Sequence, residues 1–229
     1  MKLLSDEDLE RSAVVANCRM NRERNLSGSN GYDKELGFHP LAYLKERGAL
    51  IGRSPAWLDL CCGSGKALIE AASLIRSEGW AHPPRIVGVD LVGMFLPHLR
   101  ELKGLKLVEA SLRTWQPSEP FDLITCIHGL HYVGDKLGAI ARAASWLTAQ
   151  GLFVASLDPA NLKLAESSTS NPIVAELRHS DLEFDPRRRL LRCRGVKSID
   201  LPFRYLGADD QAGPNYTRQP AVNSYYENG

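Results

Sequence analysis

The stretch from Trp57 to Ala72, WLDLCCGSGKALIEAA, constrains the fold of this chain more than any other. An apolar run ends in an acidic residue, two cysteines and a Gly-Ser-Gly turn, and apolar residues at helical spacing follow. This order predicts a buried strand that turns sharply into a helix. Gly63 and Gly65 let the backbone approach a ligand and adopt positive φ, and the helix N-terminus presents amides to it. The stretch therefore predicts a ligand site at a strand end.

Two common nucleotide-binding motifs do not describe this turn. A P-loop requires GxxxxGK[ST], but Ala67 follows Lys66 here, and no glycine stands at the required distance upstream. A dinucleotide-binding turn requires GxGxxG or GxGxxA, but Leu68 occupies the last position. Both motifs fit the chain poorly.

The segments around this turn alternate between strand-like and helix-like patterns. Strands that alternate with helices indicate a parallel sheet covered on both faces, and near-continuous apolar runs agree because such strands are buried on both sides. We expect a doubly wound α/β fold with a mostly parallel seven-stranded sheet. The expected strands are 56–61, 85–91, 105–111, 121–127 and 152–158, and the expected helices are 66–79, 94–104 and 135–151.

The N-terminal part precedes this alternation. Ser5 and Asp8 predict the start of a helix that runs to about Met20. The polar, glycine-rich segment 21–37 is expected to be a loop or a lid, and a helix closed by glycine is expected at 39–48. We expect N-terminal helices and lid at 1–50, and a ligand-binding core at 51–229, within one structural domain.

The C-terminal part has a different pattern. A hairpin that turns at Asp185-Pro186 and two further strands at 199–210 and 221–227 are expected. Antiparallel strands at one end of a parallel sheet are common in mixed sheets, so we expect an antiparallel C-terminal addition.

Charge and composition exclude several classes of protein. The formal net charge of +1 argues against a large nucleic-acid footprint, which usually brings a basic excess. The five cysteines are odd in number and irregularly spaced, and we interpret them as reduced thiols of a cytoplasmic protein. No apolar run approaches the ~20 residues of a membrane helix, and acids interrupt the N-terminus where a signal peptide is apolar. We expect no contact with a membrane.

The DLCCGSG sequence resembles motif I of the class I S-adenosylmethionine-dependent methyltransferases. The resemblance implies that Asp59 helps to hold the amino group of the cofactor, directly or through water. It also implies that the turn with Cys61, Gly63 and Gly65 carries the methionyl-ribose part past the backbone. Asp90, at the tip of the second strand, is placed to take the two ribose hydroxyls.

Later segments carry the other family motifs in order, so that the resemblance covers about 59–158. It implies that Leu91 packs on the adenine and that Cys126 and Ile127 line the cofactor. An acid often follows the third strand in this family and meets the adenine amino group, but Ser111 occupies that place here. The hydroxyl of Ser111 or the backbone of Leu112 is expected to read the adenine edge instead.

The resemblance implies in-line transfer of a methyl group from S-adenosylmethionine to a nucleophile, with S-adenosylhomocysteine as product. The turn after the fourth strand is IHGLHY and not the NPPY- or DPPY-like motif of the adenine- or amide-methylating branch. His128 and His131 are candidates for a general base because histidine titrates near neutral pH, with structural packing as the alternative for each. Tyr32 is a third catalytic candidate, as a lid tyrosine over the cofactor. The two histidines have no carboxylates at ligand spacing, so we expect no metal.

Several polar residues are candidates for substrate contacts. Arg22 and Arg24 lie in the polar N-terminal segment, and arginine suits carboxylate and phosphate groups; a solvated loop is the alternative. Tyr132 follows the histidines at the expected rim. If the strand at 199–210 runs parallel to its neighbours, its end faces the ligand edge, and the candidates Asp209, Asp210 and Tyr216 lie there.

A basic run, Arg187 to Arg189 with Arg192 and Arg194, follows the hairpin turn. Alternation predicts that Leu191 and Cys193 face inward and that the arginines form a solvated face. A nucleic-acid patch is the rival interpretation, but no appended recognition domain or series of stacking aromatic residues accompanies it.

The sequence thus predicts a cytoplasmic methyltransferase that acts on a small polar molecule, in specialised-metabolite biosynthesis by analogy with compact bacterial relatives. An RNA methyltransferase and a cofactor-binding partner protein without catalysis are the two alternatives. Either a monomer or a homodimer is compatible with the sequence.

Overall fold

A computed structural model of the chain describes residues 3–16, 23–97, 102–167 and 169–229. Its main sheet has the strand order β3-β2-β1-β4-β5-β8-β7. The strands from β3 to β5 are parallel, and β8 and β7 are antiparallel additions at one edge. The predicted doubly wound, mostly parallel sheet is therefore confirmed. The strand bounds are β1 Ala56–Leu60, β2 Arg85–Asp90, β3 Leu105–Glu109, β4 Phe121–Cys126, β5 Leu147–Ser156, β7 Glu183–Asp185 and β8 Leu190–Arg194.

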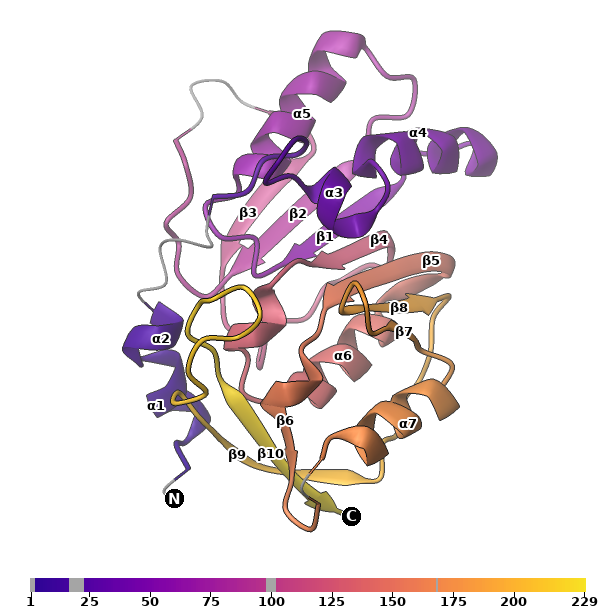
Figure 1. Cartoon of the computed structure of the whole chain (residues 1–229). Helices are drawn as coiled ribbons and strands as arrows, with labels where there is room; N and C mark the ends of the chain where they lie inside the picture. The colour runs from indigo at the N-terminus through magenta and orange to yellow at the C-terminus, as the bar shows by residue number, and fades with distance from the viewer. Residues whose placement is uncertain (1–2, 17–22, 98–101, 168) are drawn as a thin grey trace.

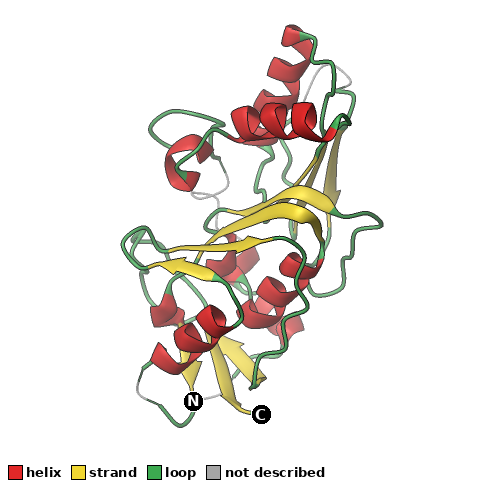
Figure 2. Cartoon of the chain, turned by 90° about the vertical axis from the view of Figure 1, so that its right-hand side faces the viewer, coloured by secondary structure: helices red, strands yellow, loops and turns green. Residues whose placement is uncertain are grey.

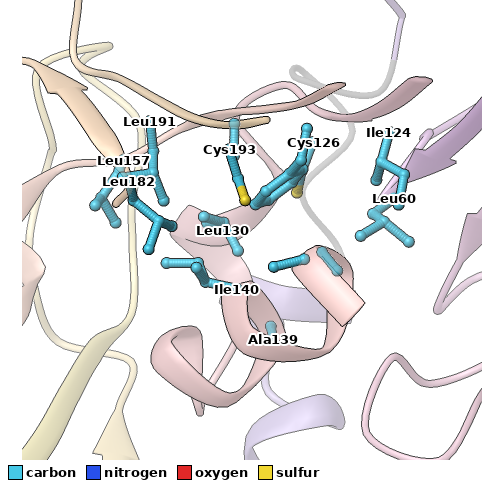
Figure 3. Close-up of a cluster of buried hydrophobic side chains, with 14 of the residues drawn as sticks. Leu60, Ile124, Cys126, Leu130, Ala139, Ile140, Leu157, Leu182, Leu191 and Cys193 are labelled. Atoms are coloured by element: carbon cyan, nitrogen blue, oxygen red, sulfur yellow. The ribbon is translucent and has the colours of Figure 1, made fainter. Parts of the chain in front are cut away.

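Helices cover both faces of this sheet, as the side view of Figure 2 shows. One face carries α3 (Tyr32–Leu36), α4 (Pro40–Ile51) and α5 (Lys66–Glu78), and the other carries α6 (Lys136–Ser145) and α7 (Asn171–His179) (Figure 1). Neighbouring strand residues serve opposite layers, because Trp57 packs in the α5 layer and Leu58 in the α6 layer. Figure 3 shows Leu191 and Cys193 of the sheet lying over Ile140 of α6.

A second sheet of three strands forms below the first and has the order β6-β10-β9. Its strands are β6 Leu162–Leu164, β9 Phe203–Asp209 and β10 Asn223–Asn228. The expectation that the last two strands extend the main sheet is wrong. β9 runs antiparallel to β10 in this separate sheet, so its end does not reach the ligand edge in the way that a parallel strand would.

The N-terminal helices pack on this small sheet, beside the C-terminal strands (Figure 1). They are α1 (Asp6–Glu10) and α2 (Ala13–Ala16), so the expected single helix is interrupted between them; its expected last part, 17–20, lies outside the described residues. The amide of Leu4 donates to the carbonyl of Ala208 at 2.8 Å, and the hydroxyl of Tyr205 donates to Asp6 at 3.0 Å. The N-terminal segment therefore packs against β9 of the small sheet. The division at residue 50 stays a prediction.

Three other expectations need correction. Residues 94–97 are not helical, because the amide of Leu96 donates to the carbonyl of Ser64 and ties this segment to the glycine turn; 98–101 lie outside the described residues. The helix expected at 135–151 ends at Ser145, since β5 begins at Leu147. Gly48 does not end α4; Gly52 does, with a φ of 65°.

Two short 3₁₀ helices complete the fold, η1 (Gly129–Tyr132) after β4 and η2 (Pro159–Asn161) after β5. None of the helices described for this chain has the length and apolar character that crossing a membrane requires.

Candidate active site

A cavity of about 160 Å³ opens at the carboxyl edge of the main sheet. The strand order reverses between β1 and β4, and ligands of open α/β sheets bind in the crevice at such a point. Residues from strand tips, from η1 and from α1 line the cavity. They include Gly63, Asp90, Leu91, Leu112, Ile127 and His128.

Asp90 holds two loops together at the mouth of this cavity. Its Oδ2 accepts the amide hydrogen of Gly63 at 2.9 Å, and its Oδ1 accepts that of Val92 at 3.1 Å. Each carboxylate oxygen can accept more than one hydrogen bond, so Asp90 can also take hydroxyl groups of a ligand. The glycine turn and the tip of β2 are thereby fixed relative to each other.

The glycine turn requires its glycines for two reasons. Gly63 and Gly65 have φ of 60° and 71°, in the left-handed region. A Cβ atom at Gly65 would lie 2.9 Å from Leu107 Cδ1, and one at Gly129, in η1, would lie 2.4 Å from Cys61 Cβ. The turn and η1 therefore approach each other too closely for larger residues.

Two residues that line the cavity adopt left-handed backbone conformations without being glycine. Cys61 has a φ of 56° and His128 a φ of 59°. Such conformations cost about 1–3 kcal/mol each and cluster at functional sites. A hydrogen bond with Cys126, followed by burial, raises the pKa of the Cys61 thiol well above its ordinary value, so this residue stays a neutral thiol.

Asp59 lies behind the glycine turn and is fully buried. Its carboxylate accepts hydrogen bonds from the hydroxyls of Tyr32 at 2.6 Å and Thr125 at 2.5 Å. Burial raises its pKa to about 7, while these two hydrogen bonds act in the opposite direction. Asp59 is fully buried and does not line the cavity, so its carboxylate orients the hydroxyls of Tyr32 and Thr125 behind the turn.

Tyr32 comes from α3, within the segment that the sequence suggests as a lid. Burial, and then Asp59, raise its pKa well above the ordinary value, so it remains a protonated donor. Its ring packs edge-on against Trp57, with 6.2 Å between the centroids. The structure therefore places Tyr32 against Asp59, where it orients a carboxylate.

The adenine-side candidates lie close to one another. Leu91, Leu112 and Ile127 all line the cavity, and Cys126 is fully buried beneath it. The hydroxyl of Ser111 donates to Oε1 of Glu10 on α1 at 2.5 Å. A carboxylate from the N-terminal helix therefore stands beside the position where the family often has an acid.

His128 faces a carboxylate that sequence reasoning missed. Its Nε2 lies 3.3 Å from Oε1 of Glu35 on α3, and the guanidinium of Arg24 lies 3.2 Å from the same oxygen. Chiefly through its contact with His128, the pKa of Glu35 is below its ordinary value. The carboxylate is therefore ionised beside the imidazole.

His131 has a different environment. It is fully buried, and neither ring nitrogen has a hydrogen-bond partner among the described residues. Burial, and then the neighbouring His128, lower its pKa well below the ordinary value. A lowered pKa makes His131 a weak proton acceptor, and it does not line the cavity as His128 does. His131 is therefore a poorer candidate for a general base than His128.

The substrate candidates are scattered over the structure. Arg22 lies outside the described residues. Asp209 is buried in the small sheet, where Asn223 and Tyr225 donate to it, and Asp210 is half-buried beside it. Tyr132 lines the cavity, and Tyr216 reaches η1 through the loop 210–222, with its hydroxyl 3.5 Å from Nδ1 of His128.

The basic hairpin is not simply a solvated face. Leu191 and Cys193 face inward as predicted. However, Arg188 donates to the carbonyl of Lys34 at 3.0 Å, and Arg192 donates to that of Leu36 at 3.2 Å. The last carbonyls of a helix lack partners within it, so these arginines bind the C-terminal end of α3.

No three histidine, cysteine, aspartate or glutamate side chains lie close enough to share a metal ion in the parts of the chain that the structure describes.

The doubly wound sheet, the glycine turn after β1 and the acid at the tip of β2 together define a class I S-adenosylmethionine-dependent methyltransferase. Residues 33–192 match the family model described as "Methyltransferase domain". The match covers more than half of the chain, which therefore belongs to this family.

Curated relatives agree with this assignment. Trans-aconitate 2-methyltransferase of Rhizobium etli is 25% identical over 135 residues, which are 56% of this chain and 50% of that protein. The Escherichia coli (strain 55989 / EAEC) protein of the same name is 28% identical over 100 residues, 43% of this chain and 37% of that one. The matched segment thus spans half or less of these relatives.

Among solved structures, N-methyltransferase NodS from Bradyrhizobium japonicum WM9, in complex with S-adenosyl-L-homocysteine, aligns with a TM-score of 0.50. The alignment covers 84% of this chain and 98% of that chain at 17% identity. This similarity shows the shared fold.

Proposed function

We propose that the chain transfers a methyl group from S-adenosylmethionine to a small polar molecule. The hydrogen bond from the Gly63 amide to Asp90 carries this proposal, because it fixes the glycine turn against the acid that would hold a ribose. The names of the curated relatives, which specify trans-aconitate as their substrate, support a small acceptor. A formal net charge of +1 is in keeping with this class of acceptor.

The residues around the cavity fit the cofactor. Leu91, Leu112 and Ile127 supply apolar surface suited to an adenine ring, and Asp90 supplies acceptors for the ribose hydroxyls. Glu10, also on the cavity wall, supplies an acceptor for the adenine amino group next to Ser111. When bound, the cofactor supplies the reactive methyl carbon.

His128 is the proposed general base for an acceptor that must lose a proton. It lines the cavity, and the ionised Glu35 beside it would stabilise the imidazolium that forms. Arg24 holds Glu35 in place from the other side. Most of the rate enhancement would come from alignment of the two reactants, which can contribute roughly 7–11 kcal/mol.

The test is calorimetric titration of the protein with S-adenosylmethionine and S-adenosylhomocysteine. We expect saturable binding that Asp90→Ala weakens at least about tenfold, as loss of charge-assisted hydrogen bonds predicts. Asp200→Ala is the matched control, since Asp200 is an exposed aspartate on the connection before β9. Binding that is absent, or equal in both variants, would refute the proposed cofactor site.

The reaction itself is tested by a screen. Formation of S-adenosylhomocysteine is measured by mass spectrometry with a panel of small polar acceptors, trans-aconitate included. Cofactor binding without turnover of any acceptor would favour a partner protein without catalysis.

A further inference from the structure

The loop 210–222, between β9 and β10, reaches the carboxyl edge of the main sheet (Figure 1). The amide of Val222 donates to the carbonyl of His131 at 2.8 Å, and Tyr216 supplies the side-chain contact. The ring of Tyr216 packs edge-on against that of His131, with 5.3 Å between the centroids, and Arg189 stacks on the ring at 4.4 Å. Tyr216 therefore contacts both His131 of η1 and Arg189.

A crevice of about 460 Å³ opens on that surface, distinct from the cavity beside Asp90. Its wall is mostly polar and includes Asp158, Asn161, Lys163, Arg189, Asn215 and Tyr216. Arg189 and Lys163 bring two positive charges, and Asp158 brings one negative charge, which pairs with Arg189 at 2.8 Å. Asp209 does not line the crevice; it accepts a hydrogen bond from the amide nitrogen of Asn223, which does.

Two residues of the crevice wall each have a buried polar atom with no hydrogen-bond partner among the described residues. These atoms are Oδ1 of Asn161 and Nδ2 of Asn215. Asn161 is 5% exposed, and its amide nitrogen donates to Asn223. More than about 90% of buried polar groups in proteins are hydrogen-bonded, so unpaired atoms gathered at one crevice indicate a polar ligand there.

We propose that this crevice binds the methyl acceptor, and that it selects a small molecule that carries an oxyanion group. Arg189 presents the planar donor fork that suits such a group, and Lys163 adds a second positive charge at the rim. Asn161 and Asn215 offer an acceptor and a donor to the polar groups of the same molecule. The proposal rests on the proposed function, because the atom to be methylated would point past Tyr216 towards His128.

The basic run of the hairpin supplies a matched pair of variants. Arg189 faces the crevice, whereas Arg187 is exposed on the same turn and does not line it. Arg189→Gln and Arg187→Gln remove the same charge. Because Arg189→Gln also leaves the buried Asp158 without this partner, Lys163→Gln serves as a second test that removes only an exposed side chain.

The experiment uses protein saturated with S-adenosylhomocysteine and two probes, succinate and inorganic phosphate, titrated by calorimetry at constant ionic strength. We expect one probe to bind, with a dissociation constant that rises roughly tenfold or more in Arg189→Gln and several-fold in Lys163→Gln, and stays unchanged in Arg187→Gln. The probe that binds distinguishes a carboxylate from a phosphate.

Two results would overturn the proposal. One is that neither probe binds to protein that has bound S-adenosylhomocysteine. The other is an equal effect of Arg187→Gln and Lys163→Gln, which would indicate general attraction of anions to the hairpin. The titration with S-adenosylhomocysteine comes first and distinguishes the two proposals. If S-adenosylhomocysteine does not bind, the proposed function is refuted; if it binds and neither probe does, only the proposed acceptor site is refuted.

Discussion

The carboxylate of Glu35 lies 3.3 Å from Nε2 of His128, although the first residue belongs to α3 and the second immediately precedes η1. The contact joins the proposed base to the N-terminal segment. Because Arg24 contacts the same carboxylate oxygen, the three side chains form a row that leads from His128 at the cavity wall to the N-terminal segment.

We therefore predict that His128→Asn lowers kcat by about 10² or more, the usual contribution of a general base, and leaves cofactor affinity unchanged. Glu35→Gln should lower kcat less, because it removes the ionised carboxylate that would stabilise the imidazolium formed during the reaction. Steady-state kinetics measure both effects, with the exposed His179→Asn as control. An unchanged kcat in His128→Asn would exclude this base.

Glu10 gives a prediction about the cofactor. Its carboxylate accepts the hydroxyl of Ser111 and lines the cavity, so Glu10→Ala should weaken binding of S-adenosylmethionine roughly tenfold, the value of a charge-assisted hydrogen bond. Glu10→Gln keeps an acceptor oxygen and should lose less. Calorimetry compares both with Glu7→Ala, an exposed change on the same helix. Equal affinities of the Glu10→Ala and Glu7→Ala variants for S-adenosylmethionine would mean that Glu10 only holds α1 against the core.

Arg192 gives a prediction about the C-terminal end of α3. Since it donates to the carbonyl of Leu36, Arg192→Gln should loosen the end of α3 and speed amide hydrogen exchange across residues 32–37. Arg194→Gln, on the same strand but pointing to solvent, should leave that exchange unchanged. Hydrogen exchange is followed by mass spectrometry. Identical protection of residues 32–37 in the two variants would show that Arg192 does not stabilise the end of α3.

Asp59 gives a prediction about stability and pH. Its pKa is raised from an ordinary value of 3.8 to about 7, so the folded state binds a proton more tightly than the unfolded state. The stabilising effect of this group is therefore fully present below its ordinary pKa and is lost as the pH rises through about 7. Relative to Asp59→Asn, the wild-type free energy of unfolding should fall between pH 4 and pH 7.

Urea unfolding of both proteins at several pH values measures this difference. A constant difference across that range would show that the carboxylate is not perturbed by burial. A difference that grows with pH would mean that its charged form is stabilised.

The central part of the site could be predicted because its residues lie where an apolar strand pattern ends and a turn begins. Asp59 and Asp90 are acids at the ends of apolar strands, and parallel strands bring their carboxyl ends to one edge. Local sequence therefore determines their position. The glycine turn is equally local, since Gly63 and Gly65 serve backbone conformations that few other residues adopt.

The periphery of the site could not be predicted in this way. Glu10 meets Ser111 across 101 positions of sequence, and Arg192 meets Leu36 across 156. Such contacts depend on how the small sheet and the hairpin are placed against the core, which periodicity does not encode. Tyr216 is among the residues that the sequence indicates, but on the premise of a parallel strand; its loop in fact returns to η1 from a strand that is antiparallel and lies outside the main sheet.

The left-handed backbone at Cys61 and His128 has a consequence for how this chain can change. Glycine would adopt either conformation without strain, so a glycine at 61 or 128 would relieve a local penalty. Each such exchange would also remove a side chain from the cavity wall. At these two positions, a substitution that stabilises the fold therefore also removes a contact with the ligand. Thermostable descendants of this protein should gain their tolerance elsewhere, and variants that gain it at Cys61 or His128 should lose turnover.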